Sequence, residues 1–366
     1  MKFSPRVLVV ALDWGWGHAS RSIPVVRAFQ KAGFRVWVGA SGDQIDFYKK
    51  EIGDVAIFSM PGYEVRYSKY LPLTLGLLLR SPLFFAKFLE ERRFVRRWAQ
   101  IHRPHIVISD SRPGCCVPGP YNIYITHQVE VIVTRCKPVD RVVSDFHRWM
   151  TRSYDEIWVP DVPERMGLSG NLGHPRQDST RLRYVGWLSR FSPLSPSHNY
   201  KYDVCFTLSG PEPHRSRFEE RILAGIHQFP GHRFALVRGT LKPSKIRWPS
   251  NVDVWDLAPV ALLQELWQQS RTHVCRAGYS TLMDLAKAGC TAWIVPTPGQ
   301  PEQQYLARLH ERLGSFKVCR EEALPWKEFL SASPHPSHPL HGGQNLLELA
   351  VEDLKQRLFR IKKITV

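Results

Sequence analysis

The 366-residue sequence contains no long uninterrupted hydrophobic run, no C-x-x-C pair of cysteines and no excess of acidic residues. Seven scattered cysteines, an odd number, argue against a disulfide framework and a zinc site, and fit a reducing cytosol. The first apolar stretch, residues 7–12, is followed at once by Asp13, so no secretory signal is expected. The longest apolar stretch starts at Leu71 but is broken by Arg80 and Lys87, which makes it a poor membrane span. These absences favour a cytoplasmic protein.

The composition is that of a folded protein with an anionic partner. Hydrophobic residues make up 43% and charged residues 23% of the chain, as in globular proteins, and the length favours two domains. The formal net charge of +17 suggests attraction to nucleic acid, an anionic membrane surface or a phosphate-bearing small molecule. Because no recognisable nucleic-acid-binding module accompanies the basic residues, nucleic acid is not expected as a partner.

Short apolar runs recur along the chain between segments with helical periodicity. Continuous rather than alternating hydrophobicity is typical of parallel strands that helices cover on both faces, so both halves are predicted to be α/β. The Gly- and Pro-rich stretch between 162 and 199 lacks periodicity and is interpreted as a hinge. The predicted strands are 7–12, 34–40, 105–110, 121–127 and 156–161 in the first half, and 203–210, 232–239, 251–257, 271–278 and 291–299 in the second.

This pattern predicts two doubly wound domains that face each other across a cleft, with ligand bound at the carboxyl ends of the strands. The N-terminal domain is expected over 1–185 and the C-terminal domain over 186–345. Residues 346–366 are expected to form a last helix, with packing against the N-terminal domain as one option. A flexible loop is expected at 331–343.

The stretch DWGWGH, residues 13–18, joins the first predicted strand to a helix. Gly15 and Gly17 allow backbone N–H groups to approach an anion, although two glycines also fit a turn with no ligand. His18 is a candidate general base, because an imidazole on a rigid strand-to-helix turn titrates near neutral pH. A histidine that only caps the helix is the alternative.

A second strand end carries RAGYST, residues 276–281, followed by Asp284 one helical turn after Ser280. A glycine turn with hydroxyl residues at a helix start suits phosphate, and an acidic residue at this spacing suits ribose hydroxyls. The loop PTPGQPEQQ then supplies Gln303 and Gln304, whose amides suit the hydroxyls of a sugar. Each of these residues could instead be an ordinary solvated polar residue, but the order in which all of them occur along the chain favours a binding site.

The segment from 275 to 315 resembles the C-terminal domain of GT-B glycosyltransferases related to glycosyltransferase family 28, which includes the N-acetylglucosaminyltransferase of peptidoglycan synthesis. The match covers about the last third of the chain, and elsewhere it is architectural. It implies a GT-B fold and a donor sugar linked to a nucleotide, for which UDP is the first candidate. The donor-site residues that it implies are Arg276, Gly278, Ser280 and Thr281 at the diphosphate, Asp284 at the ribose, Gln303 and Gln304 at the sugar, and the backbone of Asp256 and Leu257 at uracil.

In the N-terminal half, G-x-G-H resembles the first glycine loop of the same family, which implies donor contacts at Gly15 and Gly17 and an activating role for His18. Where relatives often have a Gly-rich loop at the start of the second domain, this chain has LSGPEPHR. Ser209 and Gly210 are the phosphate contacts left there.

The arrangement G-H-x-x-R, which ends at Arg21, also resembles the nucleotide-sugar hydrolases of the pseudaminic acid route, in which water attacks the donor. Asp110 and His127 follow predicted strands and join Arg21 as candidates for the acceptor side. For Asp110, a structural role in capping the turn before Arg112 is the alternative.

The basic amphipathic segment from Arg80 to Arg103 would suit an anionic bilayer and a lipid-linked acceptor, or would be an ordinary solvated helix. No D-x-D motif stands near a strand end, so no metal and no cofactor are expected. The sequence thus predicts an inverting glycosyltransferase that acts on a sugar or lipid-linked acceptor, either in the cytoplasm or peripherally on the inner face of the membrane. A nucleotide-sugar hydrolase and a noncatalytic nucleotide-sugar or anionic-lipid binding protein are the alternatives.

Overall fold

The structure is a computed structural model that divides into two compact units. The first unit contains the described residues up to Arg190 together with those from Gly343 onward, and the second contains the described residues from Phe191 to Ala332. The apolar stretch at 71–80 and most of the loop expected at 331–343 lie outside the described residues. The described residues are 4–63, 81–134, 136–164, 167–175, 180–195, 199–244, 246–332, 343 and 345–364.

The first unit is built on a parallel sheet that has seven strands among the described residues, in the order β3-β2-β1-β4-β5-β6-β7. The five runs predicted in this half form β1, β2, β4, β5 and β6, which confirms them. The short strands β3 and β7 lie at the sheet edges and are only partly buried, so they lack the continuous apolar run that revealed the others. The strands are β1 (Arg6–Ala11), β2 (Arg35–Ala40), β3 (Ala56–Ser59), β4 (Ile106–Asp110), β5 (Tyr121–Ile125), β6 (Glu156–Val159) and β7 (Leu182–Tyr184).

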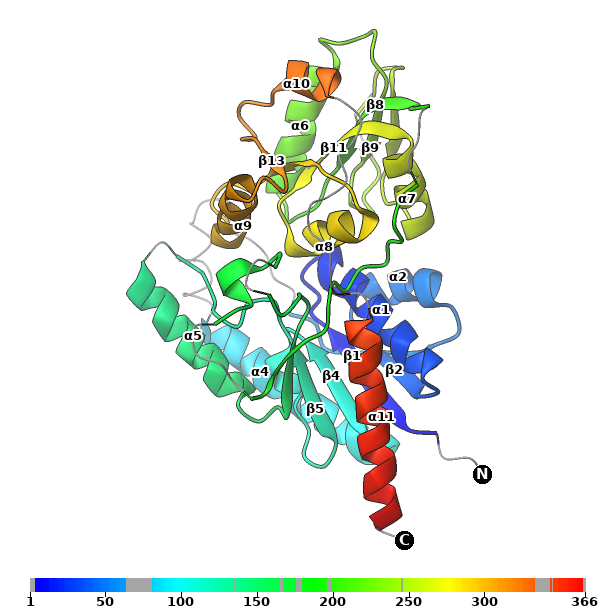
Figure 1. Ribbon diagram of the computed structural model, residues 1–366, viewed down its shortest axis with the longest axis vertical. Coiled ribbons are helices and arrows are strands. Elements are labelled where there is room, and N and C mark those ends of the chain that lie inside the picture. Colours follow the sequence, from blue (N-terminus) through cyan, green and yellow to red (C-terminus); the bar gives the residue numbers. More distant parts are fainter. Residues whose placement is uncertain are drawn as a thin grey trace. The chain divides into compact units, whose positions relative to one another are not determined.

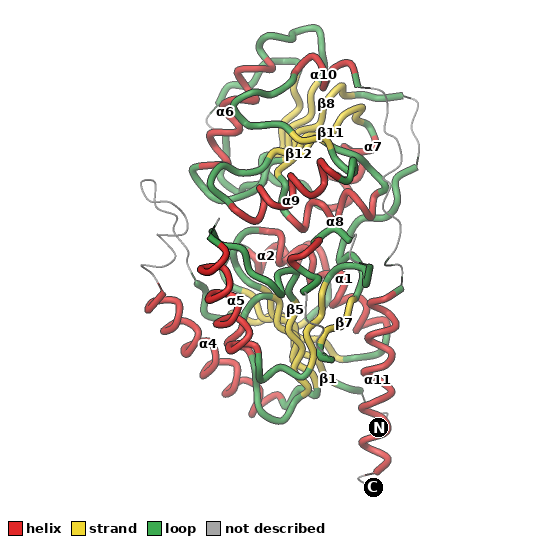
Figure 2. The backbone as a smooth tube through the Cα atoms, turned by 60° about the vertical axis from the view of Figure 1, so that its left-hand side comes forward, coloured by secondary structure: helices red, strands yellow, loops and turns green. Residues whose placement is uncertain are grey.

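Helices cover both faces of this sheet (Figure 1, Figure 2). α1, α2 and α11 lie on one side, where α1 contacts both of the others. α4 and α5 lie on the other side and both contact the short helix η1. The helices of this unit are α1 (Trp16–Lys31), α2 (Gln44–Ile52), α4 (Ser81–His102), η1 (Pro113–Cys115), α5 (Lys137–Thr151), η2 (Gly170–Leu172) and α11 (Leu346–Ile364).

Much of the segment interpreted as a hinge is built into the first unit. The carboxylate of Asp161 accepts hydrogen bonds from the backbone N–H groups of Leu168, at 3.0 Å, and Ser169, at 2.7 Å. The strand β7 follows in the same segment, and the unit continues to Arg190. Glycine and proline in this stretch therefore shape a fixed loop, because a buried carboxylate supplies the hydrogen bonds that a strand would otherwise make.

The second unit contains a parallel sheet with six strands in the described part of the chain, in the order β10-β9-β8-β11-β12-β13. All five runs predicted in this half form strands, and only the two-residue edge strand β13 was not predicted. The strands are β8 (Tyr202–Thr207), β9 (Phe234–Val237), β10 (Val252–Trp255), β11 (Ser270–Arg276), β12 (Trp293–Val295) and β13 (Lys317–Val318). The helices are α6 (His214–Ile226), α7 (Val260–Gln268), α8 (Tyr279–Ala288), α9 (Pro301–Arg312) and α10 (Trp326–Ser331).

An aromatic core packs α6 and α10 onto the second sheet. Trp326 of α10 stacks on Phe229, with ring centroids 5.7 Å apart, and packs at a tilt against Phe206, with centroids 5.5 Å apart. A Cβ atom added to Gly225 of α6 would lie 1.9 Å from the Trp326 ring. The glycine is therefore required by the close approach of the indole, although glycine costs helix stability elsewhere.

Each sheet has one place where the direction of strand addition reverses. In the first unit this place lies between β1 and β4, and in the second it lies between β8 and β11. Loops that leave the carboxyl ends of such strand pairs diverge to opposite faces and leave a crevice, where open α/β sheets bind their ligands. The loops predicted to carry the site, DWGWGH after β1 and RAGYST after β11, stand at these two points.

Candidate active site

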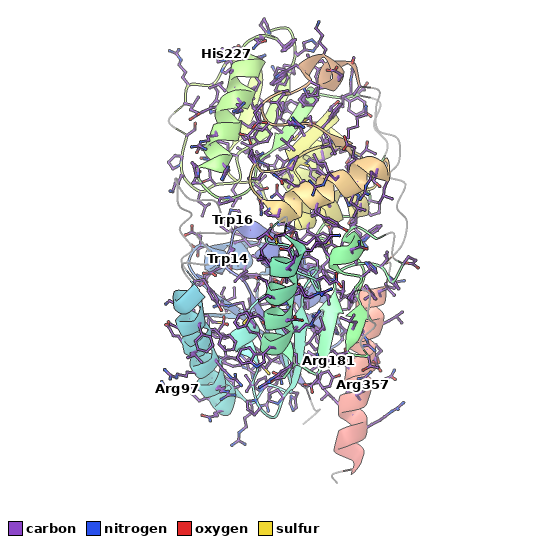
Figure 3. The ribbon with its side chains drawn as sticks, turned by 90° about the vertical axis from the view of Figure 1, so that its left-hand side faces the viewer. Trp14, Trp16, Arg97, Arg181, His227 and Arg357 are labelled. Carbon is purple, nitrogen blue, oxygen red and sulfur yellow. The ribbon has the colours of Figure 1, made fainter. Side chains whose placement is uncertain are left out.

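The turn between β1 and α1 places His18 in the first turn of a helix. Gly15 has a φ of 74°, a conformation that side chains disfavour, and it immediately precedes the helix, which starts at Trp16 and includes Gly17. The first turn of α1 contains no acidic residue, so the partial positive charge of the helix start is not neutralised there. Trp14 and Trp16 stand on either side of Gly15 (Figure 3).

His18, Arg21 and Asp110 form one hydrogen-bonded cluster where β1 and β4 end. His18 Nδ1 lies 3.1 Å from Asp110 Oδ1. Arg21 Nε donates to Asp110 Oδ2 at 2.6 Å, and its Nη2 donates to Asp110 Oδ1, so that the guanidinium grips the carboxylate with two bonds. The side chains of Arg21 and Asp110 are 2% and 1% exposed, whereas that of His18 is 19% exposed. His18 Nε2 has no hydrogen-bond partner among the described residues.

His127 and Ser111 complete the cluster. His127, which follows β5, has Nδ1 3.0 Å from Arg21 Nη1 and is buried. Ser111 has a φ of 56°, unusual for a residue other than glycine, and this turn brings its hydroxyl within 3.2 Å of Arg21 Nη2. The structure thus brings together the four N-terminal candidates other than the glycines, and adds Ser111, which the sequence interpretation missed.

The charges of this cluster set the proton affinities of its members. Burial lowers the pKa of His18 below 6.5, the positive charge of Arg21 lowers it further, and Asp110 opposes them only in part. Burial would raise the pKa of Asp110, but Arg21 and then His18 lower it by more, so the net pKa lies well below its usual range. At neutral pH the cluster therefore holds an ionised carboxylate and a neutral imidazole.

A second buried ion pair lies nearby and was not predicted. Arg112, fully buried, donates from Nε to Glu91 of α4, which is 1% exposed. Glu91 Oε2 also accepts from the hydroxyl of Tyr63, at 3.0 Å, and from the backbone N–H of Gly114, at 3.1 Å. This pair fixes the loops after β3 and β4. The sequence analysis did not single out Glu91, because its partners Arg112 and Gly114 lie more than 20 positions away along the chain.

In the second unit, the loops after β8 and β11 carry the predicted phosphate contacts. Gly210 is exposed and has a φ of 103°, and Ser209 precedes it. Gly278 precedes the first residue of α8, a helix without a side-chain N-cap bond or an acidic residue in its first turn. The residues Ser280, Thr281 and Asp284 all lie on α8 and are partly buried. Such a helix start offers backbone N–H groups to an anion.

Asp256 and Leu257 follow β10 in a loop that internal bonds hold in place. Asp256 Oδ1 accepts from Arg238 Nη1, and the backbone oxygen of Asp256 accepts the N–H of Thr240 at 2.9 Å. The carbonyl predicted to contact the base thus already accepts one hydrogen bond. Leu257 is half-buried beside it.

Arg276 is placed differently from the sequence interpretation. Its side chain is fully buried, where Nη2 donates to Glu321 Oε2 at 2.7 Å and to the carbonyl of His214 at 3.1 Å. The guanidinium lies 4.1 Å from the centroid of the Phe218 ring. Nε and Nη1 have no hydrogen-bond partner among the described residues, but the side chain has no exposed surface. The residue ties β11 to α6.

The last two glutamines of PTPGQPEQQ, Gln303 and Gln304, have different surroundings. Gln303 is buried, and its Oε1 accepts a hydrogen bond from the backbone N–H of Thr297 at 2.9 Å. Gln303 therefore holds the loop from its buried side. Gln304, the next residue of α9, is only partly buried. Gly299, with a φ of 76°, makes the turn before the helix. The two residues expected to act together thus have different surroundings.

The described residues contain no group of three or more histidine, cysteine, aspartate or glutamate side chains placed to hold a metal ion. They also contain no helix whose length and apolar character would suffice for a membrane span.

Known structures share the architecture of the chain at low sequence identity. No protein-family model matches the sequence, and no protein of curated function is significantly similar to it. The glycotransferase of kitacinnamycin aligns at a TM-score of 0.59 and 15% identity, over 97% of this chain and 95% of its own. MurG of Acinetobacter baumannii aligns at a TM-score of 0.56 and 13% identity, over 97% of this chain and 100% of its own. The spinosyn rhamnosyltransferase SpnG in complex with thymidine diphosphate aligns at a TM-score of 0.56 and 15% identity, over 97% of this chain and 96% of its own. The chain thus has the GT-B fold, with two Rossmann-like domains.

Proposed function

We propose that this GT-B protein is a glycosyltransferase that moves a sugar from a nucleotide donor, UDP-linked in the first instance, to an acceptor hydroxyl with inversion. The observation that carries the proposal is the pairing of His18 with Asp110 at the reversal point of the first sheet. The neighbours of similar fold are glycosyltransferases by name, and one of them holds thymidine diphosphate. A nucleotide-linked donor is therefore consistent both with the fold and with the loops that carry the predicted phosphate contacts.

His18 acts as the general base through Nε2. Arg21 Nη2 lies 2.9 Å from His18 Nδ1, so two tautomers compete. The two protons of Nη2 have oxygen acceptors in Asp110 and Ser111, and this leaves Nδ1–H of His18 to donate to Asp110. In that tautomer Nε2 carries a lone pair, and the side chain is partly exposed on a cluster that is otherwise buried.

The proposed reaction transfers one proton and exchanges one bond at the anomeric carbon. As the acceptor oxygen attacks the anomeric carbon, its proton passes to His18 Nε2, and the bond from that carbon to the diphosphate oxygen breaks. The new glycosidic bond forms on the opposite face, which inverts the anomeric configuration, and the nucleoside diphosphate leaves. Ionised Asp110 stabilises the imidazolium that forms.

The second unit holds the donor in this proposal. Gly278, Ser280 and Thr281 contact the diphosphate at the start of α8, with Ser209 and Gly210 as further contacts. The start of α1 at Gly15 and Gly17 adds partial positive charge. We propose that these groups stabilise the diphosphate without a metal ion and that no further cofactor takes part. The remaining donor contacts are Asp284 at the ribose, Gln304 at the sugar, with Gln303 behind it, and the backbone of Asp256 and Leu257 at the base.

Hydrolysis of the nucleotide sugar is the second candidate, and the placement of Arg21 favours it. Arg21 stands three residues after His18, as in the nucleotide-sugar hydrolases, and it contacts both His18 and Asp110. With water as the acceptor, the same base would release a free sugar.

The experiment follows nucleoside diphosphate released from a panel of UDP-linked and dTDP-linked hexoses, with and without added sugar or lipid-linked acceptors. Release that depends on an acceptor supports transfer, and equal release in its absence supports hydrolysis. No release from any donor, together with thermal stabilisation by nucleotides, would leave a noncatalytic binding protein. Repetition in EDTA tests metal independence, because the proposal expects unchanged turnover there.

A further inference from the structure

Asp13, in the turn that carries His18, is tied to helix α4 through the loop after β3. Its Oδ2 accepts a hydrogen bond from the backbone N–H of Tyr63 at 2.9 Å. The hydroxyl of Tyr63 donates in turn to Glu91 Oε2 at 3.0 Å. Burial raises the pKa of Tyr63, and the carboxylate of Glu91 raises it further, so the phenol keeps its proton and remains the donor. Two hydrogen bonds thus run from the turn of His18 to a buried carboxylate.

The same carboxylate holds the turn that carries Asp110. Glu91 pairs with Arg112, which stands two residues after Asp110, and both side chains of the pair are buried. The backbone carbonyl of Asp110 accepts the N–H of Leu12 at 3.0 Å, and Leu12 immediately precedes Asp13. The bonds therefore close on themselves and form a network, which we call the Asp13–Asp110 network, between the two turns of the candidate site.

The network is tightly packed around Tyr63. The guanidinium of Arg112 lies 5.5 Å from the centroid of the Tyr63 ring. The Trp14 ring meets the Tyr63 ring edge to face, with centroids 6.4 Å apart. A Cβ atom added to Gly62 would lie 2.7 Å from Asp13 Oδ2. Buried polar networks hold their groups in one arrangement, so we expect a change at Tyr63 to be transmitted to both turns.

We infer that Tyr63 and Glu91 are positioning residues that hold Asp110 against His18. The inference rests on the proposed function, in which His18 is the general base. In that function Asp110 accepts Nδ1–H of His18 and stabilises the imidazolium, so the placement of Asp110 sets the strength of the base. Tyr63 and Glu91 act through Asp110 and need no contact with the substrate.

Displacement of Asp110 has a defined effect on His18. Burial and the charge of Arg21 lower the pKa of His18, His127 lowers it less, and Asp110 raises it. A looser contact with Asp110 should therefore lower the pKa of His18 and slow the abstraction of a proton. A purely structural role of Tyr63 would instead affect the stability of the fold and leave this pKa unchanged.

The test is Tyr63→Phe, which removes only the hydroxyl. We expect kcat to fall by about tenfold with an unchanged KM for the donor, because the base is misplaced and the donor contacts lie elsewhere. The acid limb of kcat/KM should move to lower pH, and an NMR titration of the full chain should show a lower pKa of the His18 imidazole. Kinetics and NMR thus measure the same displacement independently.

Tyr121→Phe is the matched control. Tyr121, at the start of β5, donates to Glu156 Oε1 at 2.9 Å, at the start of β6 and so at the opposite ends of the strands. Both variants lose one tyrosine–glutamate hydrogen bond and should lose similar stability in thermal melting, but only Tyr63→Phe should change kcat and the pKa of His18. A parental pKa of His18 in Tyr63→Phe, or equal changes in both variants, would overturn the inference.

A second pair of variants tests the other end of the network. Asp13→Ala removes the acceptor of the Tyr63 N–H, whereas Asp13→Asn keeps an oxygen acceptor, and both remove the charge. We expect Asp13→Ala to lower kcat and the pKa of His18 as Tyr63→Phe does, and Asp13→Asn to lower them less. Equal effects would overturn the role of this bond. Absence of nucleotide release from any donor would contradict the proposed function instead, and the NMR titration would still decide the positioning role.

Discussion

Arg21–Asp110 in the first unit and Arg276–Glu321 in the second are both buried arginine–carboxylate pairs at strand ends, and they differ in one respect. Arg21 and Asp110 in the first unit are joined by His18, whose ring reaches solvent. Arg276 and Glu321 in the second unit are enclosed with the Phe218 ring. In the proposed function, the ion pair of the first unit therefore supports an accessible titratable group, whereas the enclosed pair of the second unit holds the fold.

The difference extends to the loops around each pair. In the first unit, the proposed function assigns the chemistry to side chains, and the backbone turn at Gly15 positions them. In the second unit, the side chains of Gln303 and Arg276 hold the loops from within, and the helix start after Gly278 presents backbone groups. We therefore expect substitutions in the first cluster to change rates, and those in the second to change stability or donor binding.

The largest effect is expected from His18→Ala, which removes the imidazole of the first cluster. We expect turnover to fall by about two to four orders of magnitude, the usual contribution of a general base, with nucleotide binding unchanged. Steady-state release of nucleoside diphosphate measures the first effect, and thermal shift with nucleotide measures the second. His227→Ala, at the exposed histidine that follows the last residue of α6 (Figure 3), is the control. A His18 variant with full turnover would remove the proposed base.

The next largest effect is expected from Arg276→Met. Loss of the guanidinium takes from the buried carboxylate of Glu321 its hydrogen-bond donor at 2.7 Å and leaves Arg221, at 3.5 Å, as a weaker ion-pair partner. The free energy of unfolding should therefore fall by about 1.5–3 kcal/mol. Urea unfolding measures it, with the exposed Arg93→Met as control, for which we expect a change within about 0.5 kcal/mol. Normal stability combined with lost nucleotide binding would instead restore Arg276 as a donor contact.

The two glutamines of α9 allow a structural role and a donor-binding role to be compared at adjacent positions. Gln303→Ala leaves the N–H of Thr297 without its acceptor and should cost about 1–3 kcal/mol of stability. Gln304→Ala should leave stability nearly unchanged and raise the KM for the donor. Thermal melting and donor titration separate the two effects. Equal behaviour of the two variants would contradict the separate roles assigned to them.

The smallest expected effect is a displacement of the pH profile. Turnover requires neutral His18, so kcat/KM should rise with pH and level off, with its acid limb below pH 6.5. Arg21→Gln removes a charge that lowers the pKa of His18, so the limb should move to higher pH. Asp110→Asn removes a charge that raises this pKa, so the limb should move to lower pH. Shifts in the same direction for both variants would contradict the proposed electrostatics.

Sequence patterns predicted the strands because long buried runs such as residues 7–12 admit few alternatives. They also identified His18, Arg21, Asp110 and His127 from their places at strand ends, and the structure brings these four together. The grouping itself was not predictable, because residues 92 positions apart meet only through the parallel register of β1 and β4.

Other features carried too little local signal. Edge strands such as β7 are short and half-exposed, so periodicity does not reveal them. The burial of Arg276 depends on Glu321, which lies 45 positions away. The apolar face of α5 that includes Phe146 and Trp149 has a clear helical pattern, but only the structure shows that this face points to solvent. A hydrophobic sequence pattern predicts where a helix or strand forms more readily than it predicts which face of that helix or strand is buried.

The packing of α11 on α1 has a consequence for how the chain is made. The first unit takes in residues from both ends of the described chain, and Arg183 of β7 binds Asp353 of α11 at 2.5 Å. Synthesis proceeds from the N-terminus, and domains ordinarily fold as they emerge. Here the second unit can finish folding while the first still lacks its last helix. Of the two units, the one whose synthesis begins earlier is therefore completed later.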